Sequence, residues 1–98
     1  MWDLNYVNDM INLKSEMIQD KDNFIREADF NRDITQCVVS RSNLLQQLTK
    51  LEEIRDEIQK CLDLEDMNDY ISQFALVHTL IESYKAITEE ARNQHPLA

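Results

Sequence analysis

Residues 34–62 read ITQCVVSRSNLLQQLTKLEEIRDEIQKCL, and this stretch has the clearest periodicity in the chain. Its apolar residues recur at alternating steps of three and four, which is the spacing of one face of an α-helix. The positions of the series are Ile34, Cys37, Arg41, Leu44, Leu48, Leu51, Arg55, Ile58 and Leu62, and Val38, Leu45 and Ile54 widen it. A stripe of this width is typical of a helix that packs against two neighbours. We therefore predict a central helix over residues 32–62, with Asn31 or Asp33 as its N-cap.

The segments before and after this helix repeat the same spacing. The first contains the series Leu4, Val7, Ile11, Ile18, Ile25 and Ala28, and the last contains Met67, Tyr70, Phe74, Val77, Ile81, Tyr84, Thr88 and Ala91. We predict helices over residues 3–28 and 66–93, and we expect the stripe of the last helix to lie in the core. Asp63 or Asp66 can cap the start of that helix, because an aspartate side chain accepts hydrogen bonds from the free backbone N–H groups there.

Glycine is absent from all 98 residues, whereas an average chain of this length carries about seven. Tight turns with positive φ and many helix C-caps depend on glycine, so its absence argues against hairpin-rich and phosphate-loop folds. Long helices with short connections remain. The predicted fold class is all-α, as a single helical domain over residues 1–98. It is either an up-down-up antiparallel three-helix bundle, or a helical hairpin or coiled coil that needs a partner chain.

The balance of charge is strongly acidic. Ten Lys and Arg residues against 19 Asp and Glu residues give a formal net charge of −9. Nucleic acids and anionic membrane surfaces attract basic proteins, so this balance argues against both as partners. The longest apolar run is residues 74–77, which is far too short to cross a bilayer. We expect protein partners, with self-association left open, no nucleic acid and no membrane insertion.

Two cysteines, Cys37 and Cys61, bear on the cellular setting. If both lie on the central helix, they are about 36 Å apart, because a helix rises about 1.5 Å per residue. This distance is far beyond disulfide reach, and neither residue belongs to a C-x-x-C pattern. Free thiols, together with an N-terminus that does not resemble a signal peptide, indicate a reducing compartment. We therefore expect a cytoplasmic protein.

The stretch CLDLEDMNDY at residues 61–70 is the strongest candidate for a chemical site, because it is rich in acids. A calcium-binding loop that begins at Asp63 would need an oxygen ligand at its fifth position and glycine at its sixth. Met67 and Asn68 occupy these positions. His78 and Glu82 lie one helical turn apart but supply only two ligands, where a metal site needs three or four. We predict no metal, no cofactor, no catalytic residues and no enzymatic activity.

Five residues are candidates for a partner interface. Arg41 and Arg55 interrupt the apolar stripe of the central helix, so each either extends to solvent or pairs with an acid from a flanking helix. We hypothesise that they set the register of the helices within the bundle or against a partner. Leu76, Leu80 and Ile87 lie partly outside the stripe of the last helix. Apolar residues on such a flank are predicted to form a strip that faces a partner.

Two runs of sequence, RDITQCVVSRSNLLQQLTKLEEI at residues 32–54 and YISQFALVHTLIESYKAI at residues 70–87, frame the acidic corner. Together they resemble the N-terminal coiled-coil segments of vesicle-tethering complex subunits, of the Golgi-associated retrograde protein complex type. The residues that carry the resemblance are Arg32, Asp33, Ile34, Leu44, Leu48, Thr49, Leu51, Tyr84 and Ile87. The chain departs from that family at Glu65, Asp66 and Asp69, where members tend to carry basic residues, and members are far longer. The resemblance implies a role in assembling a tether.

These observations predict a non-catalytic helical module for protein–protein interaction or complex assembly. One form of this prediction is a coiled-coil part of a vesicle-tethering complex. The alternative is a small acidic adaptor, chaperone or inhibitor that binds a basic partner protein.

Overall fold

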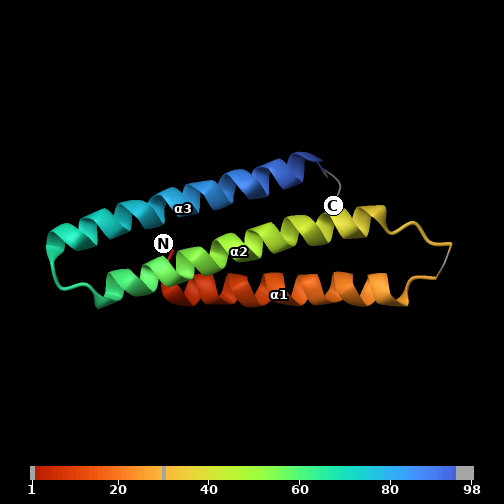
Figure 1. The fold of residues 1–98 in the computed structure, drawn as a ribbon, viewed down its shortest axis with the longest axis horizontal. Helices are drawn as coiled ribbons and strands as arrows, with labels where there is room; N and C mark the ends of the chain where they lie inside the picture. Colours follow the sequence, from red (N-terminus) through yellow and green to blue (C-terminus); the bar gives the residue numbers. More distant parts are fainter. Residues whose placement is uncertain (1, 30, 95–98) are drawn as a thin grey trace.

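The computed structural model describes residues 2–29 and 31–94, and within them the chain forms three helices and no strand. Helix α1 spans Leu4–Glu27, α2 spans Thr35–Asp63 and α3 spans Met67–Gln94. They run up, down and up in an antiparallel three-helix bundle (Figure 1). The predicted all-α class is confirmed. The wide apolar stripe of the central segment has the expected consequence, because α2 contacts both α1 and α3.

The bundle is elongated because its outer helices are staggered along α2. The molecule measures 59 × 23 × 16 Å, and its radius of gyration is 16.6 Å, against about 13 Å for a compact domain of this length. In Figure 1, α3 extends past the start of α1 at one end, and α1 extends past the end of α3 at the other. Each end of the molecule is therefore two helices thick, and only its middle is three helices thick.

The core lies in the middle of the bundle, where all three helices overlap. Val7 of α1, Leu51 and Ile54 of α2, and Tyr84 of α3 form a fully packed cluster. The side chains packed against it are Trp2, Met10, Ile11, Ile58, Leu80 and Ile81. Burying one such apolar side chain stabilises the fold by about 1.5–3 kcal/mol. The cluster thus holds the outer helices to α2 over the length that they share.

Aspartate side chains cap the starts of α1 and α3. At α1, Asp3 Oδ1 accepts a hydrogen bond of 2.8 Å from the backbone N–H of Tyr6. At α3, Asp66 Oδ1 accepts bonds of 2.8 Å from Asn68 N–H and 3.3 Å from Asp69 N–H. Of the two predicted caps, Asp66 is the one used, and Asp63 is the last residue of α2. No described residue has positive φ, so these connections do not need glycine.

The start of α2 was predicted three residues too early. Asp33 Oδ1 accepts a hydrogen bond of 2.9 Å from Thr35 N–H, which is a turn that precedes a helix rather than part of one. This bond also lowers the pKa of the Asp33 carboxyl. Ile34 occupies the N-cap position and makes no capping bond with its side chain. The connection between α1 and α2 is correspondingly longer than the sequence suggested.

The stripe of α3 was predicted to lie in the core along its whole length, and this is wrong at its N-terminal end. Val77 and Tyr84 are buried, but Tyr70 and Phe74 are 41% and 50% exposed. The stagger of the helices is the cause. The first turns of α3 pack against the last turns of α2 beyond the start of α1, so α1 does not run alongside this part of α3 (Figure 1).

Candidate functional site

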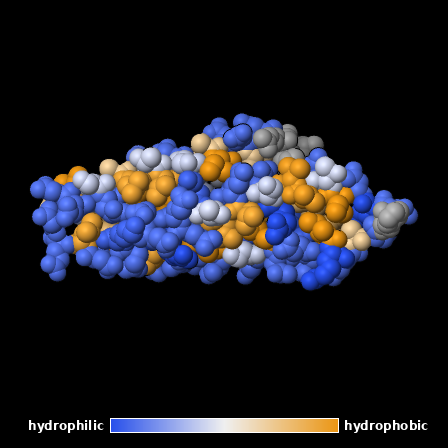
Figure 2. All heavy atoms as spheres, in the orientation of Figure 1, coloured by the Kyte–Doolittle hydropathy of each residue, from blue (hydrophilic) through white to orange (hydrophobic). Residues whose placement is uncertain are grey.

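A group of large apolar side chains is exposed where α2 ends and α3 begins. It consists of Leu62, Met67, Tyr70, Ile71 and Phe74, which we call the end surface. Leu62, Met67 and Ile71 are each at least 60% exposed. Figure 2 shows apolar atoms gathered in separate groups along one face of the molecule, including groups toward both ends. Large apolar side chains exposed close together in the chain are typical of surfaces that bind other molecules.

Helical spacing places the α3 members of the end surface side by side. Met67, Tyr70 and Phe74 follow one another at steps of three and four, so they lie on one face. The rings of Tyr70 and Phe74 are nearly parallel, with their centroids 6.2 Å apart. Together the two rings form a stacked aromatic surface about one helical turn long.

A polar contact between helices fixes this part of α3 against α2. The side-chain amide of Gln73 donates hydrogen bonds to the backbone oxygen of Glu57, at 3.3 Å, and to the Glu57 carboxylate. The same carboxylate accepts a bond of 2.9 Å from Lys60 Nζ. The bonds from Lys60 and Gln73 lower the pKa of the Glu57 carboxyl, because they favour its charged form. Gln73 lies between Tyr70 and Phe74 in sequence, so this contact orients the end surface.

A groove of about 320 Å³ adjoins the end surface. Its walls come from the start of α1, the last turns of α2 and the first turns of α3. The lining residues are Trp2, Asp3, Leu4, Asn5, Ile58, Cys61, Leu62, Tyr70, Phe74 and Val77. Burial, with a smaller contribution from the Glu57 charge, raises the pKa of the Cys61 thiol. Cys61 therefore stays protonated near neutral pH and contributes to a mainly apolar wall.

Acidic side chains predominate at the corner between α2 and α3, next to the groove. Acidic side chains follow the corner between α2 and α3, and all of them are exposed: Asp63, Glu65, Asp66 and Asp69. The sequence contains no Lys or Arg between Cys61 and Tyr84. The end surface thus combines an apolar centre with an acidic border.

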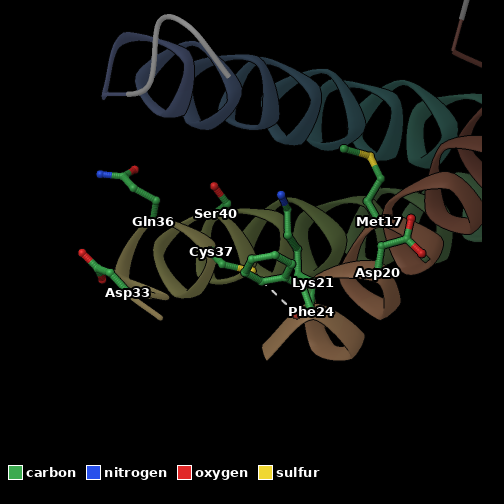
Figure 3. Close-up of a pocket in the computed structure, with 8 residues that line it drawn as sticks. All are labelled: Met17, Asp20, Lys21, Phe24, Asp33, Gln36, Cys37 and Ser40. Carbon is green, nitrogen blue, oxygen red and sulfur yellow. Dashed lines mark hydrogen bonds between the residues drawn. The ribbon is translucent and has the colours of Figure 1, made fainter. Parts of the chain in front are cut away.

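A second hollow, of about 660 Å³, lies at the opposite end of the molecule, between α1 and the start of α2. Figure 3 shows its lining, which mixes apolar, acidic, basic and amide side chains. The Cys37 thiol donates a weak hydrogen bond of 3.7 Å to the backbone oxygen of Lys21, drawn as a dashed line in Figure 3. Within the described residues, no group of three or more His, Cys, Asp or Glu side chains is arranged to hold a metal ion.

The five predicted interface residues are spread along the molecule. Arg41 forms an ion pair with Asp22, and so links α2 to α1. Arg55 pairs at 3.1 Å with Asp56, its neighbour on the same helix, and is partly exposed. Leu76 is 44% exposed, whereas Leu80 packs against the core cluster and Ile87 is half-buried. The structure therefore does not bring these residues together on one surface.

The end surface escaped sequence reasoning, although its residues were recognised as members of apolar stripes. Periodicity shows which face of a helix is apolar, but it does not show how far the neighbouring helix extends along that face. Leu62, Tyr70 and Phe74 continue the core stripes of their helices without a break. The local sequence therefore contains no signal that separates these residues from the core members of the same stripes.

None of the helices in the described part of the chain is long and apolar enough to cross a membrane. Comparison with models of known protein families, with curated proteins and with solved structures finds no match for this chain. The chemistry of its surface is therefore the basis for a functional proposal.

Proposed function

We propose that the protein is a non-catalytic helical module that binds another protein chain through the end surface. The observation that carries this proposal is the exposure of Leu62, Met67, Tyr70, Ile71 and Phe74 where α2 ends and α3 begins. Burying these apolar side chains against a partner is favourable by about 25 cal/mol for each Å² of surface removed from water.

The shape of the molecule supports the same proposal. Its accessible surface is 7071 Å², whereas a compact monomer of this mass exposes about 5,800 Å². The excess follows from the stagger of the helices, which leaves both ends without a third layer. A bundle with an uncovered two-helix end is well suited to associate with further helices.

The test compares two substitutions of an exposed aliphatic residue by serine, one in the end surface and one outside it. Ile71→Ser and Leu13→Ser each remove an exposed branched side chain from a helix, at 60% and 54% exposure. Partners captured on the wild-type protein from its native cells should be lost with Ile71→Ser and retained with Leu13→Ser. Equal recovery of every identified partner by the two variants, both shown to be folded by circular dichroism, would contradict the proposal.

One specific form of this function is assembly of a vesicle-tethering complex. It is supported by the resemblance of residues 32–54 and 70–87 to tethering subunits and by the rod shape of the bundle. Partners that are themselves long coiled coils would favour this form. Both cysteines are free and lie on one helix, which supports placing the interaction in the cytoplasm.

A second candidate is a small acidic adaptor, chaperone or inhibitor that binds a basic partner. The acidic residues beside the end surface favour it. Its distinguishing property is a bound partner with a basic surface that is released by salt, because exposed charge pairs weaken as ionic strength rises.

A further inference from the structure

We propose that the groove at the end surface binds an amphipathic helix of a partner protein, and that this helix carries Lys or Arg residues beside its apolar face. The bound helix would lie between α2 and α3 beyond the start of α1, where it would supply the third helix that this end lacks. This inference rests on the proposed function, and it adds the shape and charge of the partner segment.

The geometry of the groove fits a helix. Its walls are the last turns of α2 and the first turns of α3, and the start of α1 closes one end at Trp2 and Leu4. Along α3 the exposed apolar side chains extend from Met67 to Phe74, and the buried Val77 follows one turn later. The exposed part of this row is about 10 Å long, which corresponds to about two turns of a bound helix. Apolar residues at steps of three and four on the bound helix would pack against these exposed side chains.

The border of the groove selects the charge of that helix. Asp3 lines it, and the exposed Asp63 and Asp69 adjoin its lining residues Leu62 and Tyr70 in sequence, with Glu65 on the corner between them. Lys60, the nearest basic residue in sequence, is bonded to Glu57. A partner with Lys or Arg on the flanks of its apolar face would neutralise this border, whereas a partner with acidic flanks would be repelled.

The same charges argue against the other possible occupants. A second copy of this chain would bring an identical acidic border against the first, and like charges placed together across an interface oppose association. An anionic membrane surface attracts basic segments and would be repelled by these carboxylates. A basic helix is therefore the occupant that the observations favour.

The fluorescence of a tryptophan in the groove can report the binding of a peptide. Trp2 is the only tryptophan of the chain, and its ring lines the groove. The probe is a synthetic helix of about 15 residues, free of tryptophan, with Leu at steps of three and four and Lys or Arg on both flanks. A second peptide keeps the Leu face and replaces every base with Glu. A third has the composition of the first in an order that destroys the apolar face.

We expect the first peptide to bind the full chain, as measured by Trp2 fluorescence and by anisotropy of the labelled peptide. The two control peptides should bind at least about tenfold more weakly, since charge repulsion or loss of the anchors removes a substantial part of the binding free energy. Phe74→Ser should raise the Kd of the first peptide at least about tenfold, because a central aromatic side chain is a typical hot spot. Leu13→Ser should leave this Kd unchanged.

Two double variants test the role of the acidic border. The double variant Asp63→Asn, Glu65→Gln should weaken binding of the first peptide and reduce the dependence of its Kd on salt. The double variant Glu89→Gln, Glu90→Gln makes the same change of net charge on exposed residues near the other end of α3 and should leave the Kd unchanged. Equal effects of the two double variants would overturn the assignment of the border.

Several outcomes would overturn the inference while keeping the proposed function. Equally tight binding of the acidic and the basic peptide would show that the groove does not select the charge of its partner. A second outcome is a dimer, detected by light scattering and dissociated by Phe74→Ser, together with a lack of peptide binding. This result would show that a second copy of the chain occupies the groove. If no peptide binds and the end-surface variants change neither oligomeric state nor captured partners, the proposed function fails as well.

Discussion

Trp2 and Tyr84 meet edge to face, with their ring centroids 5.5 Å apart and their planes inclined by 71°. This contact joins the segment before α1 directly to the middle of α3. Tyr84 is 7% exposed, and burial raises the pKa of its hydroxyl. Because Trp2 also lines the groove, the same contact determines where the three-helix part of the bundle stops and the two-helix end begins.

Replacing Trp2 with alanine should lower the free energy of unfolding by about 2 kcal/mol, since it removes a large half-buried ring and an aromatic pair. Urea denaturation followed by circular dichroism measures the loss. Tyr6→Ala is the matched control, because the Tyr6 ring contacts Trp2 at 5.3 Å from the other side but is 45% exposed. It should cost about half as much or less. Equal losses would contradict the role assigned to the contact of Trp2 with Tyr84.

The number of helices and the identity of the central one follow from periodicity and from the lack of glycine. Leu44, Leu51 and Ile54 are buried as the central stripe predicts. The relative displacement of the helices does not follow, because it depends on where packing side chains of different helices meet. Trp2 meets Tyr84, and in this register the first turns of α3 extend beyond the start of α1, where Tyr70 and Phe74 stay largely exposed. A single stripe therefore contains both core residues and the end surface.

The cap of the last helix was likewise only partly predictable from the sequence. Asp63 and Asp66 were equivalent candidates in sequence, since both precede the last apolar stripe. In the structure, α2 continues through Asp63, so only Asp66 is placed to accept bonds from the first free N–H groups of α3. The choice depends on where the preceding helix ends, and helix ends are set by tertiary contacts that a local pattern does not contain.

Asp66→Ala should destabilise the protein by about 1 kcal/mol, which is the usual effect of losing an N-cap side chain. The backbone N–H groups of Asn68 and Asp69 lose their acceptor, so their hydrogen exchange should accelerate. Asp63→Ala serves as the control and should change stability by less than about 0.5 kcal/mol, as expected for an exposed residue outside such a contact. Similar effects of both variants would show that charge near the helix start, rather than capping, stabilises α3.

The ion pair of Arg41 with Asp22 should contribute little to stability, because both side chains are more than a third exposed. A double-mutant cycle with Asp22→Asn and Arg41→Gln should give a coupling of less than about 1 kcal/mol that falls with added salt. Arg41→Leu tests the separate hypothesis that this residue sets register. The variant should remain folded but change its oligomeric state or its partners, and an unchanged state and partner set would reject that hypothesis.

The two thiols should differ in reactivity. Cys37 is partly exposed, whereas Cys61 is buried and its pKa is raised by burial, so Cys61 holds less of the reactive thiolate at neutral pH. Alkylation followed by mass spectrometry should therefore modify Cys37 first, and the difference should vanish in urea. Modification of Cys61 at the same rate as Cys37 in the folded protein would contradict the buried position of the Cys61 thiol.

Acidification should weaken the contact between α2 and α3 through Glu57. Hydrogen bonds from Lys60 and Gln73 lower the pKa of this carboxyl in the folded state below its usual value of 4.5. The unfolded chain then binds a proton more readily than the folded one, so the stabilising contribution is fully present above that value. It is lost as the pH falls through the lower, folded-state pKa. Urea denaturation at a series of pH values measures this contribution as a difference between the wild type and Glu57→Gln.

The gap in stability between these two proteins should be constant near neutral pH and should shrink as the solution is made acidic below about pH 4.5. Glu89→Gln is the control, since Glu89 is exposed and lies on the last turns of α3. Its difference from the wild type should stay small over the same range. A gap for Glu57→Gln that does not change with pH would show that the carboxylate does not fasten α3 to α2. The orientation of Tyr70 and Phe74 would then depend on apolar packing and on the bond from Gln73 to the Glu57 backbone oxygen.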